Sequence, residues 1–255
     1  MKTTNSPFDI EILFVGNSLT KGQIGESFVE KIKYDNLNWE ISNAGVDGDT
    51  LKNISDRLLV IISNDFIFDF IVIEAGHNDI ILPEFKEKGV LFNLGLKFLL
   101  RKGRRPLSII NFRTEYLKLI TDLKTKTEAK IILTTLSCIN ENLNSKTNRL
   151  REEYNIIIKD IAQQTNCIIA DVSDEFDKIL KMNNQTDYLL EDFFNSVYID
   201  KKVCLQPNGS DRLSEKRNLK LTIDGIHLNK EGARVYKEII EQTIKKSACN
   251  STFAK

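Results

Sequence analysis

Short apolar runs alternate with longer amphipathic segments along the chain. The runs are rich in Ile and Val, and several are apolar nearly throughout, as strands buried on both faces of a sheet must be. The predicted strands span residues 10–15, 39–42, 70–74, 130–135 and 167–172. The predicted helices span residues 23–34, 50–63, 113–127, 145–165 and 229–246. Strands separated by helices predict βαβ units, and therefore a parallel sheet with helices on both sides.

Two segments interrupt this alternation. Residues 80–112 hold an apolar stretch that is followed by four basic residues within positions 101–105. Residues 181–221 read as a long, polar and irregular connection. Long loops in a compact domain often have a functional role. No fixed-period repeat or low-complexity linker divides the chain, so we expect one domain over residues 1–255 with two long insertions.

The charge balance argues against a nucleic-acid partner. Thirty-six basic residues offset 36 acidic ones, whereas nucleic-acid binding depends on neutralising phosphates with a basic surface. The chain also lacks a run of about eighteen apolar residues, so no transmembrane helix is predicted. These features do not indicate a nucleic-acid partner, and they leave the oligomeric state open.

The N-terminal residues and the cysteines indicate which cellular compartment to expect. Asp9 and Glu11 interrupt the first apolar run before it reaches the length of a signal peptide. The four cysteines lie far apart and form no CxxC pair, which makes a zinc ribbon or a redox motif a poor interpretation. We therefore expect a cytoplasmic protein with reduced thiols, or a secreted one if a leader precedes this sequence.

Small and polar residues follow three predicted strands and precede the last predicted helix. The sequences are GNSLT at 16–20, NAGVDG at 43–48, GHND at 76–79 and DGIH at 224–227. In an open parallel sheet, ligands bind at the carboxyl ends of the strands. We therefore expect these four blocks to meet in one site.

The four blocks resemble those of the SGNH hydrolase, or GDSL-like lipase/esterase, family. That family carries a GDS motif, an N-x-G-x-x-G block, a G-x-N-D block and a D-x-x-H block, and this chain has their counterparts in the same order. The resemblance implies a flavodoxin-like three-layer α/β/α sandwich with a five-stranded parallel sheet in the order 2-1-3-4-5. One position departs from the family, since Asn17 stands where the motif has aspartate. That aspartate is not the triad acid, so the change concerns hydrogen bonding in the loop.

The resemblance implies a catalytic triad of Ser18, Asp224 and His227. An unassisted hydroxyl is a weak nucleophile and needs a base such as imidazole. Asp224 precedes His227 by three residues, close enough in a turn to bond the second ring nitrogen and set its tautomer. The backbone N–H groups of Ser18 and Gly45 and the side chain of Asn78 would stabilise the oxyanion. No metal and no organic cofactor are expected.

Other interpretations of the same residues are weaker. Lys21 precedes Gly22, which is the wrong register for a P-loop, and Thr20 replaces the second glycine of a GxSxG elbow. His77 is expected to be a structural hydrogen-bonding residue beside the site. Cys138 is expected to be buried and inert.

The basic stretch at 97–105 and the apolar residues beside it allow several interpretations. Its cations suit a solvated helix end, where the helix dipole favours them, but a lid, a contact for an anionic substrate or a membrane-surface contact stay open. The apolar residues beside it are expected to pack against the body of the domain, with an acyl-chain groove as the alternative. They are Leu91, Phe92, Leu94, Leu96, Phe98 and Leu99.

The resemblance implies hydrolysis of a carboxylic ester through an acyl-enzyme on Ser18, with a small-molecule or carbohydrate ester as the expected substrate. A short acyl group, such as acetyl on a carbohydrate, is favoured because no strong membrane-binding helix is visible. Two alternatives stay open: an acyltransferase with the same triad, and a non-catalytic protein that binds a carbohydrate or another partner on this scaffold.

Overall fold

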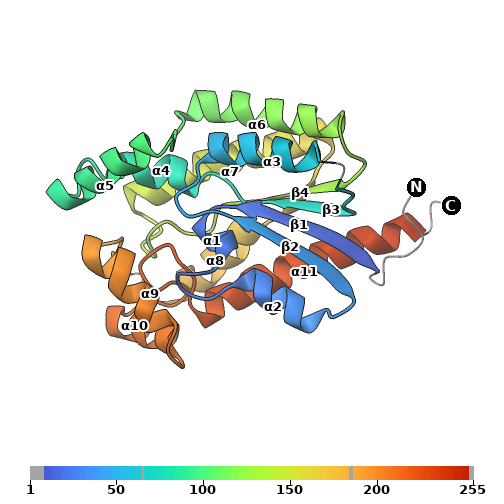
Figure 1. Ribbon diagram of the computed structural model, residues 1–255. Coiled ribbons are helices and arrows are strands. Elements are labelled where there is room, and N and C mark those ends of the chain that lie inside the picture. Colours follow the sequence, from blue (N-terminus) through green and yellow to red (C-terminus); the bar gives the residue numbers. More distant parts are fainter. Residues whose placement is uncertain (1–8, 65, 184–185, 253–255) are drawn as a thin grey trace.

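The computed structural model describes residues 9–64, 66–183 and 186–252, and a parallel sheet lies at its centre. The five strands follow the order β2-β1-β3-β4-β5, which confirms the expected fold (Figure 1). Every predicted strand is present, with ends that differ by a few residues. The strands are β1 (Ile10–Gly16), β2 (Trp39–Gly45), β3 (Phe70–Ile73), β4 (Lys130–Thr134) and β5 (Ile168–Ala170).

Burial in the strands follows their position in the sheet. All four residues of β3, a central strand, are buried, because helices cover both faces there. The edge strand β2 instead alternates, with Trp39 and Ile41 buried and Glu40 and Ser42 exposed. Its pairing with β1 places Gly45 opposite Gly16. The ends of these two strands therefore lie side by side.

Helices cover both faces of the sheet (Figure 1). The five predicted helices are present, and α8 was not predicted. On one face lie α3 (Leu51–Ile62), α6 (Ile109–Lys124) and α7 (Lys146–Thr165). On the other lie α2 (Phe28–Asp35), α8 (Val172–Lys181) and α11 (Lys230–Thr252). Among the residues described, no helix combines the length and the apolar character needed to cross a bilayer.

The first unusual segment, residues 80–112, forms much of α4 (His77–Glu84), all of α5 (Val90–Arg101) and the start of α6. Phe92 and Leu96 on α5 pack into the core, as expected, but Leu94 and Phe98 are more than half exposed. The C-terminal end of α5 lies within the basic stretch at 97–105, and Arg104, which follows the helix, forms an ion pair with Asp49 at 3.2 Å. The basic stretch is therefore partly a helix end and partly an anchor for the loop after β2.

The expectation of an irregular connection over 181–221 is wrong in its second half. That half forms the π-helix η1 (Asn195–Ile199), α9 (Asp200–Cys204) and α10 (Gly209–Arg217). Most residues of α10 are polar, so it has no clear hydrophobic periodicity in the sequence. An ion pair of 2.8 Å between Arg217 and the buried Asp200 joins α10 to α9. Tertiary contacts of this kind stabilise helices that local patterns do not predict.

Candidate active site

Ser18 begins the short helix α1 (Ser18–Lys21), directly after β1. The side chain of Asn17 accepts a hydrogen bond from the Leu19 N–H and so caps this helix. Gly22 ends the helix with a φ of 69°, in the left-handed region that favours glycine. This strand-turn-helix geometry places the Ser18 hydroxyl at the carboxyl end of the sheet.

Asp224 and His227 lie in the loop before α11 and reach Ser18 from the other end of the chain. One oxygen of Asp224 accepts the backbone N–H groups of Ile226 and His227, at 3.0 and 2.8 Å. The other lies 2.7 Å from His227 Nδ1. His227 Nε2 lies 3.0 Å from Ser18 Oγ. The three residues predicted from the sequence therefore form one hydrogen-bonded chain.

The surroundings of this pair change both pKa values. Burial opposes the charged form of Asp224, but the charge of His227 and three hydrogen bonds outweigh it, so the pKa of Asp224 is lowered. Burial also opposes the charged imidazolium, yet the charge and hydrogen bond of Asp224 outweigh it and raise the pKa of His227. The site thus stabilises a protonated His227, which is the species that forms when Ser18 loses its proton.

Asn78 lies close to Ser18, near the start of α4, and both line one cavity. Its side-chain amide donates to the Asp49 carbonyl at 2.9 Å. An amide nitrogen carries two hydrogens. One N–H of Asn78 therefore remains for a ligand.

The Gly45 N–H has a hydrogen-bond partner within β2. It donates to the side chain of Asn43 at 2.9 Å, so this donor is already occupied. A Cβ on Gly45 would lie 2.3 Å from the backbone nitrogen of Lys21, which shows that glycine is needed here for close packing of β2 against α1. Gly48, with φ of 73°, lines the cavity instead, and its N–H bonds to no other residue in the described parts of the chain.

Sequence reasoning missed Glu74, which binds the loop that carries Ser18. Its buried carboxylate accepts the Asn17 backbone N–H at 3.3 Å, the Asn17 side-chain N–H at 2.9 Å and the Thr20 hydroxyl at 3.2 Å. His77 Nδ1 lies 2.7 Å from the same carboxylate. A charged residue at the end of an otherwise apolar strand was the signal available in the sequence.

Glu141, a second buried carboxylate, binds the loop before Asp224 in the same way. It is buried, and its carboxylate accepts the backbone N–H groups of Lys220, Leu221 and Thr222 at 2.7 to 2.8 Å. The Thr222 hydroxyl donates to it as well, at 2.8 Å. Glu141 therefore fixes the backbone two residues before Asp224.

His77 and Cys138 match the structural roles expected for them. His77 Nε2 lies 3.2 Å from the Ser137 hydroxyl, and both side chains are buried. The hydroxyl of Tyr236 also bonds Ser137, at 3.1 Å. Burial raises the pKa of the Cys138 thiol well above its usual value, which disfavours the reactive thiolate. In the described chain, no group of three or more His, Cys, Asp or Glu side chains could hold a metal ion.

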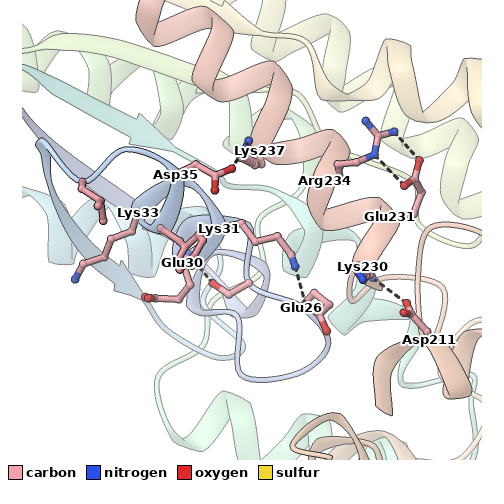
Figure 2. A pocket seen from close by; sticks show the side chains of 13 residues that line it. Glu26, Glu30, Lys31, Lys33, Asp35, Asp211, Lys230, Glu231, Arg234 and Lys237 are labelled. Atoms are coloured by element: carbon pink, nitrogen blue, oxygen red, sulfur yellow. Dashed lines mark hydrogen bonds and ion pairs between the residues drawn. The ribbon is translucent and has the colours of Figure 1, made fainter. Parts of the chain in front are cut away.

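Two of the hollows in the described parts of the chain can be compared as binding sites. The larger, about 1090 Å³, lies between α2 and α11 and is lined by charged side chains (Figure 2). Most of those charges pair, as in Lys31–Glu26 at 3.0 Å, Lys237–Asp35 at 2.7 Å and Arg234–Glu231 at 2.6 Å. No triad residue lines it. The second cavity, about 420 Å³, is lined by Ser18, Asn78 and His227 and is therefore the candidate active site.

Comparisons with known proteins agree with this architecture. An acetylxylan esterase from Geobacillus stearothermophilus is 24% identical over 196 residues, covering 67% of this chain and 80% of its own. A crystal structure of an acetylxylan esterase from that organism has a TM-score of 0.59 at 19% identity, covering 93% of this chain and 94% of its own. An alpha/beta hydrolase enzyme from the metagenome of Lake Arreo, Spain, has a TM-score of 0.64 at 15% identity, covering 93% and 96%.

A family model gives the most direct assignment. The model of the GDSL-like lipase/acylhydrolase family matches residues 14–235. This range holds all four blocks that carry the resemblance, together with Glu74 and Glu141. The chain therefore belongs to the GDSL-like lipase/acylhydrolase family.

Proposed function

We propose that this protein hydrolyses carboxylic esters through an acyl-enzyme on Ser18. The observation that carries the proposal is the hydrogen-bonded chain from Ser18 Oγ to His227 Nε2 at 3.0 Å and from His227 Nδ1 to Asp224 at 2.7 Å. A hydroxyl, a base and an orienting carboxylate in this order are the requirements for nucleophilic acyl transfer.

In the first half-reaction, Ser18 Oγ attacks the carbonyl carbon while His227 takes the hydroxyl proton. The carbonyl electron pair moves to oxygen, which becomes an oxyanion. When the intermediate collapses, the bond to the alcohol oxygen breaks and His227 returns the proton to that oxygen. Water then attacks the acyl-enzyme with His227 as its base, which releases the acid and restores Ser18.

The oxyanion needs donors that are in place before the reaction. We assign this role to the Ser18 N–H, the free N–H of the Asn78 side chain and the Gly48 N–H. Gly48 replaces Gly45 in this set, because the Gly45 N–H is occupied by Asn43 whereas Gly48 lines the cavity.

A carbohydrate is the alcohol part that we favour. The relative that is 24% identical is named an acetylxylan esterase, and a structural neighbour from the same organism has the same name. The test is release of the carboxylic acid from O-acylated xylo-oligosaccharides, with added free sugar or alcohol in a parallel sample. Transfer of the acyl group to the added acceptor, in preference to water, would identify an acyltransferase.

The nucleophile is tested by measuring the intact mass after exposure to a fluorophosphonate. We expect one adduct on the unmodified sequence and none on the Ser18→Ala variant, together with loss of p-nitrophenyl acetate turnover in that variant. Equal turnover by both proteins would remove Ser18 from the mechanism and return a non-catalytic binding role to consideration.

A further inference from the structure

The active-site cavity is polar at one end and apolar over most of its length. Ser18, Gly48, Asn78 and His227 form the polar end. The apolar wall comes from α4, α5 and the segment before η1; its main residues are Ile81, Leu82, Phe85, Phe92, Phe98, Leu99, Leu190 and Phe193. We propose that this wall binds an unbranched acyl chain of about eight carbons. The proposal rests on the proposed function and replaces the short acyl group that the sequence favoured.

The direction of the reaction places the acyl chain along α4 and α5. The acyl carbonyl must face Asn78, which is the second residue of α4. Ile81 and Leu82 follow on the same helix about one turn later and line the same cavity. The alcohol must lie near His227, because His227 protonates its oxygen as it leaves. Of the three groups on the carbonyl carbon, the oxygen faces the donors and the alcohol faces His227, so the acyl chain is the group that the apolar wall receives.

The size of the cavity exceeds what an acetyl group needs. Its volume is about 420 Å³, which corresponds to roughly a dozen groups of the size of a water molecule at about 30 Å³ each. An acetyl group has a single methyl to place beyond the carbonyl and would leave most of the apolar wall in contact with water. A chain of about eight carbons covers that wall and still leaves room for the first part of the alcohol.

The far part of the wall is a row of aromatic rings. Phe85 and Phe92 meet edge to face with centroids 5.1 Å apart, and Phe92 and Phe193 do so at 5.4 Å. Gly95 permits this contact, since a Cβ there would lie 2.5 Å from the Phe193 ring. The ring row therefore joins α5 to the segment before η1 and closes the cavity on that side. Figure 1 shows these two parts of the chain at the same end of the molecule.

Few charged side chains line the cavity. They are Asp47 and Lys201, beside the titratable His77 and His227. Asp47 forms an ion pair with Lys21 at 2.7 Å and belongs to the loop that carries Gly48. A sugar ring at the wall would leave hydroxyl groups without partners, which is costly, whereas an alkyl chain gains from burial.

The test compares p-nitrophenyl esters from acetate to laurate, which share one alcohol and differ only in the acyl chain. Each buried methylene should raise kcat/KM by about three- to fourfold, so octanoate should exceed acetate by at least about 100-fold. A kcat/KM that is equal for both esters, or higher for acetate, overturns the proposal.

Variants on α5 locate the effect. Phe98 lines the cavity and is 59% exposed, so Phe98→Ala should leave the fold intact and lower the octanoate-to-acetate ratio by about 10-fold. Gly95→Leu, which inserts bulk against Phe193, should lower the same ratio. Leu94→Ala is the matched control, because Leu94 is on the same helix, is 54% exposed and does not line the cavity. An unchanged ratio in both Phe98→Ala and Gly95→Leu contradicts the proposal.

Failure of this inference is distinguishable from failure of the proposed function. If Ser18→Ala abolishes turnover of every ester but acetate is the preferred substrate, the mechanism stands and the acyl-chain assignment falls. If Ser18→Ala retains turnover, the mechanism itself is wrong.

Discussion

The side-chain amide of Asn17 donates to the buried carboxylate of Glu74 at 2.9 Å, one residue before the nucleophile. The family motif has aspartate at this position. Here an aspartate would face Glu74 as a second carboxylate, and two like charges at this distance in a buried site cannot both remain ionised at low cost. Asn17 and Glu74 are therefore a complementary pair, and the departure from the motif is explained by the residue at the end of β3.

The pair predicts that Asn17→Asp impairs the protein although it restores the family residue. We expect a loss of at least about 10-fold in kcat/KM and a lower free energy of unfolding by about 1–3 kcal/mol, because a hydrogen bond is replaced by repulsion in a buried site. Urea unfolding and p-nitrophenyl ester turnover measure both effects.

A double variant that combines Asn17→Asp with Glu74→Gln tests that explanation. In Asn17→Asp/Glu74→Gln the amide and the carboxylate exchange places, so the double variant should recover part of what Asn17→Asp loses. Additive losses in the double-mutant cycle would show that the two residues do not act as a pair.

The triad predicts large losses of activity that do not add. Ser18→Ala and His227→Ala should each lower kcat by about 10³- to 10⁶-fold, and the double variant should be no worse than either one, since the residues act as a unit. Circular dichroism should show the fold retained, because both side chains lie at the rim of the sheet. A double variant that is much slower than both single variants would indicate separate roles.

The raised pKa of His227 predicts the acid side of the pH profile. Only neutral imidazole can accept the Ser18 proton, and Asp224 stabilises the charged form, so kcat/KM should rise with pH through a pKa above the ordinary value of about 6.5. Asp224→Asn removes the charge that raises this pKa, so the acid limb should move to lower pH while the plateau falls. A limb that stays in place, or moves to higher pH, contradicts the assignment of Asp224.

Asn78 is predicted to act on kcat more than on KM. Removing one oxyanion donor typically lowers kcat by about 100- to 1,000-fold, and Asn78→Ala removes the side-chain N–H without touching the triad. Since the same side chain also bonds Asp49, the thermal unfolding midpoint should be measured alongside. A change confined to KM would place Asn78 in ground-state binding instead.

The two glycines of the second block are predicted to differ in stability. Gly45→Ala forces a Cβ to within 2.3 Å of the Lys21 backbone, so it should destabilise the protein strongly. The nearest atoms to a Cβ on Gly48 are 3.5 Å away, and only its φ of 73° opposes a side chain. Gly48→Ala should therefore cost only about 1–2 kcal/mol. A Gly45→Ala variant as stable as Gly48→Ala would contradict the packing role of Gly45.

The layered fold and the triad were predictable from the sequence. The central strands are continuous apolar runs because both of their faces are covered, and five of the helices show clear amphipathic periodicity. The triad residues follow strands or precede a helix in motifs whose order is distinctive. Strands, helices and motif blocks depend on residues that are near one another in the sequence, so local sequence patterns predict them.

The support around the triad was decided by the tertiary structure. Glu74 and Glu141 accept hydrogen bonds from segments far away in the sequence, and Gly48 lines the same cavity as Ser18. An ion pair between Arg217 and Asp200 joins α10 to α9. The apolar cavity likewise forms only when α4, α5 and the segment before η1 meet. A buried carboxylate is tolerated only where several donors converge on it, and that convergence comes from contacts between distant segments, which no local pattern records.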